Sequence, residues 1–196
     1  MLTVNEKNRG YFKIEGAARA FNFDFRDKVV LDIGSSTGGF TEYALDHGAK
    51  KVIAVEKGTN QMKEPLRSDP RVELHEKTDI FDFEITEMSS EGHPEEDISV
   101  ILADVSFVSL TKILVHAKKY LSNKNTNFLV MLKPQFEAEP HELNKGIVKN
   151  EKIRREIIKK FEQWLKNNGF VIIKKQDNQL HGKYGNLERF YWLKLI

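Results

Sequence analysis

The sequence predicts a doubly wound α/β fold, in which helices cover both faces of one mostly parallel sheet. Short β-branched runs alternate with stretches of helical periodicity along the chain. This alternation is typical of parallel strands joined by right-handed crossovers. Several of the runs are apolar almost throughout, which suits strands that are buried on both faces. The last two runs follow each other without an intervening helix, so we expect an antiparallel hairpin at one edge of the sheet.

Seven runs are predicted strands, because they are short, mostly apolar and bounded by polar or turn-forming segments. They span residues 28–33, 51–55, 71–74, 98–103, 127–132, 170–175 and 189–195. Helices are predicted over residues 38–47, 60–67, 110–121 and 151–168. The last helix carries an apolar stripe at helical spacing and stops before Gly169, as expected for an amphipathic helix that packs on a sheet. Two segments, 86–97 and 133–150, are predicted loops, and the length of the second favours a functional role.

The composition indicates a single domain over residues 1–196. With 40% hydrophobic residues and a formal net charge of +2, the chain can bury one core and is not a grossly basic nucleic-acid coat. It has no cysteine, which excludes disulfides and thiolate sites. The six histidines show no ligand spacing, so we expect no metal. No apolar run approaches the roughly 18 residues that span a membrane, so we expect a cytoplasmic protein with no membrane partner.

Charge is unevenly placed along the chain. The segment 69–104 is strongly acidic, whereas the segment 141–196 is basic. A basic end on a near-neutral protein is suited to a phosphate backbone, and a solvated helix surface is the alternative interpretation.

A glycine-rich turn, residues 32–40, lies where the first predicted strand meets the first predicted helix. Glycines there let the backbone approach a ligand, and the following helix offers free N–H groups. In a dinucleotide-binding turn the middle glycine makes room for a pyrophosphate, but Ser36 holds that position here. No Gly-Lys-Ser/Thr follows either, so the turn favours neither a nicotinamide dinucleotide nor a nucleoside triphosphate.

Acidic residues at successive strand ends favour S-adenosylmethionine, which has a ribose diol and an amino-acid tail but no phosphate. Glu56 follows the second strand, where a carboxylate can accept both ribose hydroxyls. Asp79 follows the third, where it can accept the adenine amino group. Helix-capping acids beside an ordinary turn are the alternative. The predicted cofactor-binding residues are Asp32, Gly34, Ser35, Ser36, Thr37, Gly38, Gly39, Phe40, Glu56, Lys57, Asp79, Ile80 and Asp104.

Two further polar residues close the next strands. Asp104 follows the fourth predicted strand, and Lys133 follows the fifth. In open α/β sheets, residues at the carboxyl ends of strands face the ligand crevice. A lysine that only reaches solvent from the sheet rim is the alternative for Lys133.

With these residues in place, the sequence resembles the TlyA-type haemolysins, which are FtsJ-like ribosomal RNA 2′-O-methyltransferases. The most specific matches are Lys-Pro-Gln-Phe-Glu at 133–137 and Gly-Asn-Leu-Glu at 185–188. The remaining matches, between Arg9 and Leu193, are Arg9-Gly10 with Lys13, residues 32–41, 66–72 and 104–107, Lys145-Gly146 and Trp192.

The resemblance implies a seven-stranded Rossmann-like S-adenosylmethionine methyltransferase fold, and ribosomal RNA or a ribosomal subunit as the partner. It places the family's catalytic Lys-Asp-Lys-Glu set on Lys13, Asp104, Lys133 and Glu188. Family members usually carry an N-terminal RNA-binding domain ahead of the Arg-Gly pair, where this chain has eight residues. We therefore expect a methyltransferase domain without that module.

The chemistry explains why such residues are needed. A ribose 2′-hydroxyl is a weak nucleophile, so an enzyme must align its oxygen with the sulfonium methyl group and remove its proton. Lys133 is the candidate base or oxyanion-steering group, which Asp104 would orient, and Glu188 would hold Lys13 or the ribose. The candidates for RNA contact are Arg9, Lys145, Lys183 and Tyr184, for each of which an ordinary exposed side chain is the alternative.

Other functions remain as alternatives. A non-catalytic RNA-binding relative would keep the fold, but it has no physical need for the paired lysines. A membrane-active haemolysin is disfavoured because the apolar stripe of 151–168 is the expected core face of a helix. A nicotinamide oxidoreductase is an alternative because fold alone does not fix function, but Ser36 in place of the middle glycine disfavours it. Methylation of a base amino group is disfavoured because residues 104–107 lack the prolines typical of that reaction.

Overall fold

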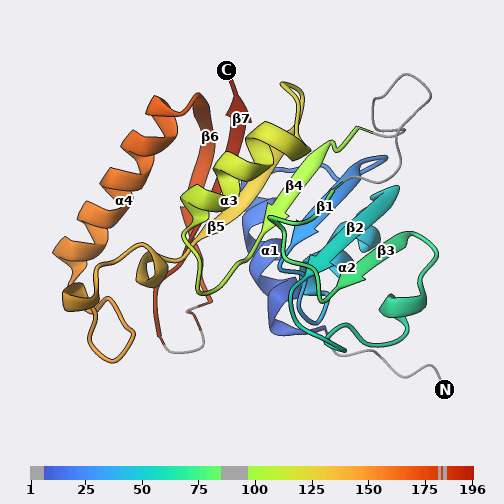
Figure 1. Cartoon of the computed structure of the whole chain (residues 1–196), viewed down its shortest axis with the longest axis horizontal. Coiled ribbons are helices and arrows are strands. Elements are labelled where there is room, and N and C mark those ends of the chain that lie inside the picture. Colours follow the sequence, from blue (N-terminus) through green and yellow to red (C-terminus); the bar gives the residue numbers. More distant parts are fainter. Residues whose placement is uncertain (1–6, 85–96, 181, 183–184) are drawn as a thin grey trace.

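The computed structural model of the chain describes residues 7–84, 97–180, 182 and 185–196. One seven-stranded sheet with the strand order β3-β2-β1-β4-β5-β7-β6 forms its centre (Figure 1). The first five strands pair in parallel, whereas β7 runs antiparallel to both β5 and β6. The predicted doubly wound sheet with a C-terminal antiparallel hairpin at one edge is confirmed. The strands are β1 (Val29–Ile33), β2 (Lys51–Glu56), β3 (Val72–Glu76), β4 (Val100–Ala103), β5 (Asn127–Leu132), β6 (Phe170–Asp177) and β7 (Arg189–Leu195).

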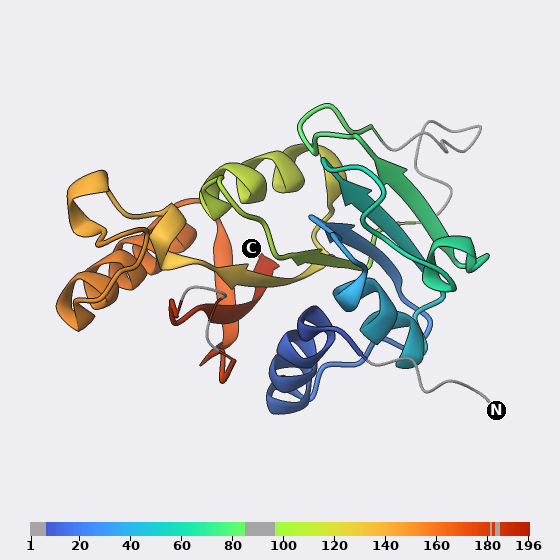
Figure 2. The ribbon, with the colours of Figure 1, turned by 90° about the horizontal axis from the view of Figure 1, so that it is seen from below.

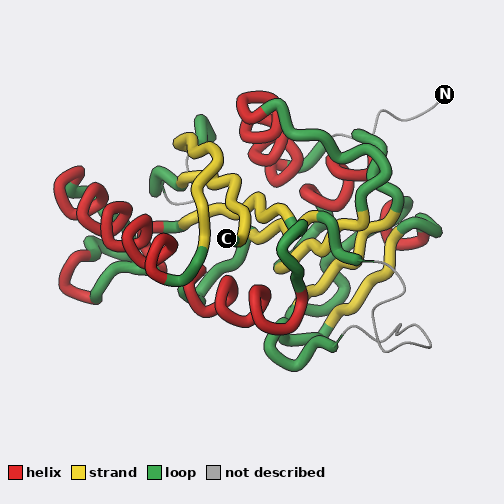
Figure 3. Tube along the Cα trace, turned by 90° about the horizontal axis from the view of Figure 1, so that it is seen from above, coloured by secondary structure: helices red, strands yellow, loops and turns green. Residues whose placement is uncertain are grey.

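Helices cover both faces of the sheet (Figures 2 and 3). On one face, α1 (Arg9–Phe21) and α2 (Gly39–Asp46) share a core with Val30 and Val52. On the other face, α3 (Leu110–His116), its continuation η2 (Ala117–Leu121) and α4 (Glu151–Asn167) share a core with Leu31 and Ile53. Side chains alternate along a strand, so each central strand contributes to both cores. This explains why these strands are apolar at nearly every position.

The register of the sheet brings the ends of several strands to one edge. Ile33 lies opposite Val55 on β2 and Ala103 on β4, so the residues after these three strands begin at the same level. β7 is antiparallel, and Arg189 at its start lies opposite Leu132 at the end of β5. The residue before β7 therefore lies at the same edge as the residue after β5.

The predicted helix over residues 60–67 is wrong. The structure has only a short 3₁₀ turn there, η1 (Leu66–Ser68). Pro65 lacks the N–H that a helix interior needs and disfavours helical backbone at the residue before it. The preceding backbone is held by Glu76, whose carboxylate accepts hydrogen bonds from the N–H groups of Asn60, Gln61 and Met62 at 3.0, 2.8 and 3.4 Å.

Helix α1 was not predicted from the sequence, although it has 13 residues. Its buried face uses small residues, Ala17 and Ala18, beside Ile14 and Phe21, so its apolar periodicity is weak. Asn8 caps it by accepting a hydrogen bond from the Tyr11 N–H at 3.1 Å. The predicted loop 133–150 contains two 3₁₀ turns, η3 (Pro134–Phe136) and η4 (Pro140–Glu142). The predicted loop 86–97 lies outside the described residues, apart from Asp97.

Candidate active site

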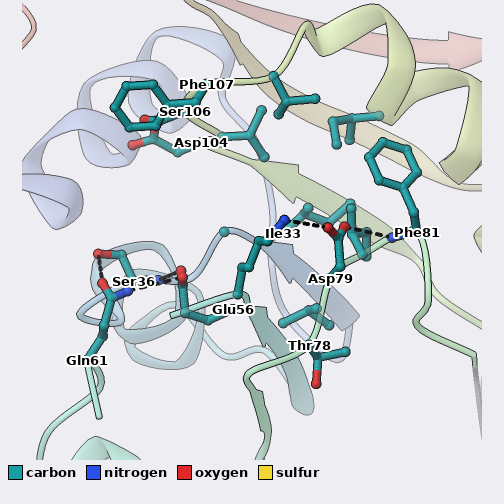
Figure 4. A pocket seen from close by; sticks show the side chains of 17 residues that line it. Ile33, Ser36, Glu56, Gln61, Thr78, Asp79, Phe81, Asp104, Ser106 and Phe107 are labelled. Carbon is teal, nitrogen blue, oxygen red and sulfur yellow. Dashed lines mark hydrogen bonds and ion pairs between the residues drawn. The ribbon is translucent and has the colours of Figure 1, made fainter. Parts of the chain in front are cut away.

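Two adjoining cavities open at the edge of the sheet where the strand ends meet. The larger has a volume of about 740 Å³ and lies over the ends of β1, β2 and β4 (Figure 4). The smaller, of about 260 Å³, lies between the glycine-rich turn, the start of α1 and Lys133. Gly34, Ser36, Asp104 and Ser106 border both cavities. A ligand in the larger cavity would therefore reach the smaller one beside Asp104.

The glycine-rich turn depends on backbone conformations that favour glycine. Gly34 and Gly38 have φ angles of +77° and +88°, in the left-handed region that L side chains rarely adopt. A Cβ atom at Gly38 would lie only 2.3 Å from the side chain of Leu66, and one at Gly34 would lie 3.3 Å from the Asp104 carbonyl oxygen. The turn is thus packed closely between neighbouring segments, which leaves its ligand side clear.

Two predicted residues of this turn bury polar atoms that have no hydrogen-bond partner among the described residues. They are Oδ1 of Asp32 and Oγ of Ser35. The other oxygen of Asp32 accepts a 2.7 Å hydrogen bond from the Thr41 hydroxyl. The pKa of Asp32 is raised to about 7, mainly by burial. The negative charges of Asp104 and Glu56 also raise this pKa, whereas the hydrogen bond from Thr41 lowers it. Buried polar atoms are normally paired, so the hydroxyl of Ser35 fits a polar ligand group in the smaller cavity, which Ser35 borders and Asp32 does not.

Glu56 and Asp79 both border the larger cavity, as Figure 4 shows. Glu56 accepts hydrogen bonds from the backbone N–H of Ser36 at 2.9 Å and of Gly58 at 2.6 Å. Gln61 donates to the same carboxylate at 3.1 Å. Asp79 is paired with Lys57 at 2.8 Å, and this hydrogen bond is the main cause of the lowered pKa of Asp79.

The larger cavity has the chemistry that an adenosine group requires. Its walls include the apolar side chains of Ile33, Val55, Ile80 and Val105, which suit a flat ring. Carboxylates at Glu56 and Asp79 can accept the hydroxyl and amino protons of such a ligand. The residues present therefore fit an adenosine-containing cofactor.

The four residues of the predicted catalytic set form a connected row of charges. Glu188 Oε2 accepts a 2.8 Å hydrogen bond from Lys13 Nζ. Lys13 Nζ lies 3.7 Å from Asp104 Oδ2, and Lys133 Nζ lies 2.6 Å from Asp104 Oδ1. Lys13, Lys133 and Glu188 are only 8%, 9% and 3% exposed. Buried charges need such partners, and their catalytic role stays a prediction.

The other predicted cofactor-binding residues divide between the two cavities, except Asp32 and Gly38, which border neither. Lys57 and Ile80 border the larger one, and Ser35, Thr37, Gly39 and Phe40 border the smaller one. Of the predicted RNA-contacting residues, Arg9 borders the smaller cavity. Lys145 lies exposed in a tight turn between Asn144 and Ile147 and borders neither cavity. Lys183 and Tyr184 lie outside the described residues.

Several residues at the site were not predicted from the sequence, and three of them have a chemical role to consider. Gln61 and Ser106 border the cavities, and Ser106 Oγ accepts a 2.9 Å hydrogen bond from Lys133 Nζ. Phe107 is 92% exposed beside the larger cavity, with a φ angle of +64° and its ring centroid 5.2 Å from that of Phe136. The Asp-Val-Ser-Phe motif was the available signal, but only its aspartate had an evident chemical role.

Within the described ranges, no group of three His, Cys, Asp or Glu side chains is arranged to hold a metal ion. The described helices also include none that combines the length and the apolar character needed to cross a membrane.

The strand order places the chain in the doubly wound α/β class, with a cavity whose lining fits an adenosine group beside the buried Lys-Asp-Lys-Glu row. The chain belongs to the FtsJ-like methyltransferase family, whose model matches residues 7–195. The chain is 38% identical to Hemolysin A from Brachyspira hyodysenteriae over 177 residues, which is 90% of this chain and 71% of that protein.

Two further proteins extend this comparison. The chain is 32% identical to the 23S rRNA (cytidine-2′-O)-methyltransferase TlyA from Campylobacter jejuni, over 94% of this chain and 69% of that protein. Among solved structures, a candidate hemolysin from Lactococcus lactis superposes with a TM-score of 0.87 and 34% identity, covering 95% of this chain and 87% of that one. The fold is therefore shared with these proteins, and the sequence similarity extends over most of the chain.

Proposed function

We propose that this chain transfers a methyl group from S-adenosylmethionine to a ribose 2′-hydroxyl of ribosomal RNA. The observation that carries the proposal is the place of Asp104, which borders both cavities and pairs with Lys133. A cofactor with its adenosine in the larger cavity and its tail at Ser35 in the smaller one would meet a substrate at this carboxylate.

The chain's own groups match each part of the cofactor. Glu56 would accept the ribose hydroxyls, Asp79 the adenine amino group, and Asp32 with Ser35 the polar amino-acid tail. When bound, S-adenosylmethionine supplies a methyl group activated by a positively charged sulfur. The aliphatic walls around Ile80 and Val105 would exclude water from the adenosine side.

The two buried lysines would take part in removing the proton of the ribose 2′-hydroxyl. Lys133, once it has lost its own proton to solvent, takes the proton of the 2′-hydroxyl while the oxygen bonds to the methyl carbon. The electron pair of the broken carbon–sulfur bond stays on sulfur, which becomes a neutral thioether. Asp104 orients Lys133, and Glu188 holds Lys13, whose positive charge stabilises the developing oxyanion.

An RNA substrate is supported by the rim of the site and by a relative. TlyA from Campylobacter jejuni carries the name of a 23S rRNA (cytidine-2′-O)-methyltransferase. Phe107 offers an exposed ring on which an extruded base can stack, and Arg9 can pair with a phosphate. A ribosomal substrate would place the protein in the cytoplasm, where ribosomes act.

Two measurements test the proposal. Calorimetric titration of the purified chain should show S-adenosylmethionine binding near one equivalent and no binding of NADH. Transfer of tritiated methyl groups to ribosomal subunits that lack 2′-O-methylation should then be lost in Lys133→Ala with cofactor binding retained. Lys124→Ala, at an exposed lysine away from both cavities, is the matched control. Near-normal transfer by Lys133→Ala would refute the assignment.

A further inference from the structure

The side-chain nitrogen of Lys133 is held by two groups of different charge. Asp104 Oδ1 lies 2.6 Å from Nζ, and Ser106 Oγ accepts a hydrogen bond from Nζ at 2.9 Å. A lysine ammonium has three N–H bonds. One of them is directed at Ser106 in a hydrogen bond, whereas Asp104 is paired with the ammonium group by charge alone, since its Oδ1 has no hydrogen-bond partner among the described residues. Ser106 is therefore the group that sets the direction of Nζ beside the smaller cavity.

The second buried lysine has different surroundings. Lys13 Nζ lies 2.8 Å from Glu188 and 3.7 Å from Asp104, so both of its partners are carboxylates. Lys133 shares Asp104 but has the neutral hydroxyl of Ser106 where Lys13 has Glu188. Two negative charges hold a proton on a buried amine more strongly than one does. Lys133 thus faces one carboxylate and one neutral hydroxyl, whereas Lys13 faces two carboxylates.

We propose that Ser106 is a positioning residue for the methyl transfer: its hydroxyl fixes the direction of Lys133 Nζ without adding a second negative charge. Ser106 thereby acts through Lys133, the base of the proposed reaction. The inference rests on the proposed methyltransferase function. The proton released from Lys133 goes to water, and the vacated position then accepts the proton of the ribose hydroxyl as the oxygen–carbon bond forms and the carbon–sulfur bond breaks.

The loop that carries Ser106 is fixed on both sides by the segment that carries Lys133. At its far end, Glu137 accepts hydrogen bonds from the Ser109 hydroxyl and the Leu110 N–H, both at 2.7 Å. At its near end, Lys133 contacts Asp104 and Ser106 themselves. These contacts hold Ser106 in one position relative to Lys133, as a positioning role requires.

The test compares three substitutions in the complete chain. We expect Ser106→Ala to lower kcat ten- to a hundredfold with unchanged KM for S-adenosylmethionine, since hydrogen bonds to charged groups contribute that much. Ser106→Thr, which keeps the hydroxyl, should restore most of the rate. Ser106→Asp should move the acidic limb of the pH–rate profile to higher pH, because it gives Lys133 a second carboxylate. Ser122→Ala, at a hydroxyl that donates to the Lys118 carbonyl, is the control.

A second readout does not depend on activity. In trace acetylation by acetic anhydride, followed by mass spectrometry, Lys133 should react faster in Ser106→Ala, slower in Ser106→Asp and unchanged in Ser106→Thr, with Lys13 as internal reference. Equal kcat and equal Lys133 reactivity in wild type and Ser106→Ala would overturn the proposal, as would an equal loss of rate in the Ala and Thr variants. If the wild-type chain methylates no ribosomal subunit, the proposed function fails, and acetylation still decides whether Ser106 controls Lys133.

Discussion

Glu188 and Lys13 are 175 positions apart in the sequence, yet they form a 2.8 Å buried hydrogen bond. Lys13 comes from helix α1, and Glu188 lies just before the antiparallel strand β7. Because β7 runs against its neighbours, its first residues lie beside the carboxyl end of β5. The reversed strand thus brings a fourth charged side chain to the edge where Asp104 and Lys133 already lie.

The first prediction concerns the stability of this pair. Glu188→Leu should lower the free energy of unfolding by about 3–5 kcal/mol, because it leaves Lys13 as a buried cation without its nearest partner. The double variant Lys13→Met/Glu188→Leu should regain most of that stability and still lack methyl transfer. Urea denaturation measures the first effect and tritium transfer the second. A double variant whose loss of stability equals the sum of the two single losses would show that the two side chains are not energetically coupled.

Asp32 should make the protein less stable as pH rises. Its pKa is raised from 3.8 to about 7 when folded, so between these values the unfolded chain releases this proton while the folded protein retains it. The contribution of Asp32 to stability is therefore full below pH 3.8 and falls through the pH range up to about 7, by roughly 1 kcal/mol per pH unit.

The measurement is the free energy of unfolding at several pH values for wild type and Asp32→Asn, without cofactor. Asparagine cannot ionise, so the difference between the two curves should grow in favour of Asp32→Asn as pH rises. Parallel curves over this pH range would contradict the raised pKa.

The sequence was sufficient for most of the fold, and the reasons for its failures are local. The strands at 127–132 and 189–195 have the predicted bounds, because they are short, mostly apolar or aromatic runs bounded by polar segments. Helix α1 was not predicted because its buried Ala17 and Ala18 are small and give a weak apolar periodicity. The helix predicted over 60–67 is wrong because Glu76, at the end of β3, binds the backbone of this segment. No local sequence pattern indicates such a long-range contact.

The candidate site shows the same division. Glu56, Asp79 and Asp104 could be predicted as ligand-facing, since strand ends in a parallel sheet meet at one edge. Glu188 could be placed only through the family resemblance, because its approach depends on the reversal of β7. The roles of Ser106 and Phe107 depend on the loop geometry after Asp104, including the positive φ of Phe107, which residue identity does not reveal.

Glu56 should control cofactor affinity. Its carboxylate is already held by two backbone N–H groups and by Gln61, so it is oriented before a ligand arrives. Glu56→Ala should weaken S-adenosylmethionine binding by tenfold or more, because two ribose hydroxyls lose their acceptor. Calorimetry measures this directly. Glu139→Ala, at an exposed carboxylate that borders neither cavity, should bind like wild type. Unchanged affinity in Glu56→Ala would show that Glu56 does not bind the ribose hydroxyls.

Phe107 should serve RNA binding at the expense of backbone strain. A large exposed ring on a left-handed residue costs about 1 kcal/mol or more relative to glycine, and burial offers no compensation at 92% exposure. Phe107→Gly should therefore unfold at the same or a slightly higher temperature than wild type. It should raise the KM for the ribosomal substrate by roughly tenfold, as expected for one lost base–aromatic stack, with S-adenosylmethionine affinity unchanged. Phe107→Tyr keeps the ring and should keep the KM, and Tyr120→Ala, at an exposed ring that borders neither cavity, is the control. If Phe107→Gly kept the wild-type KM, the ring would have no part in holding RNA.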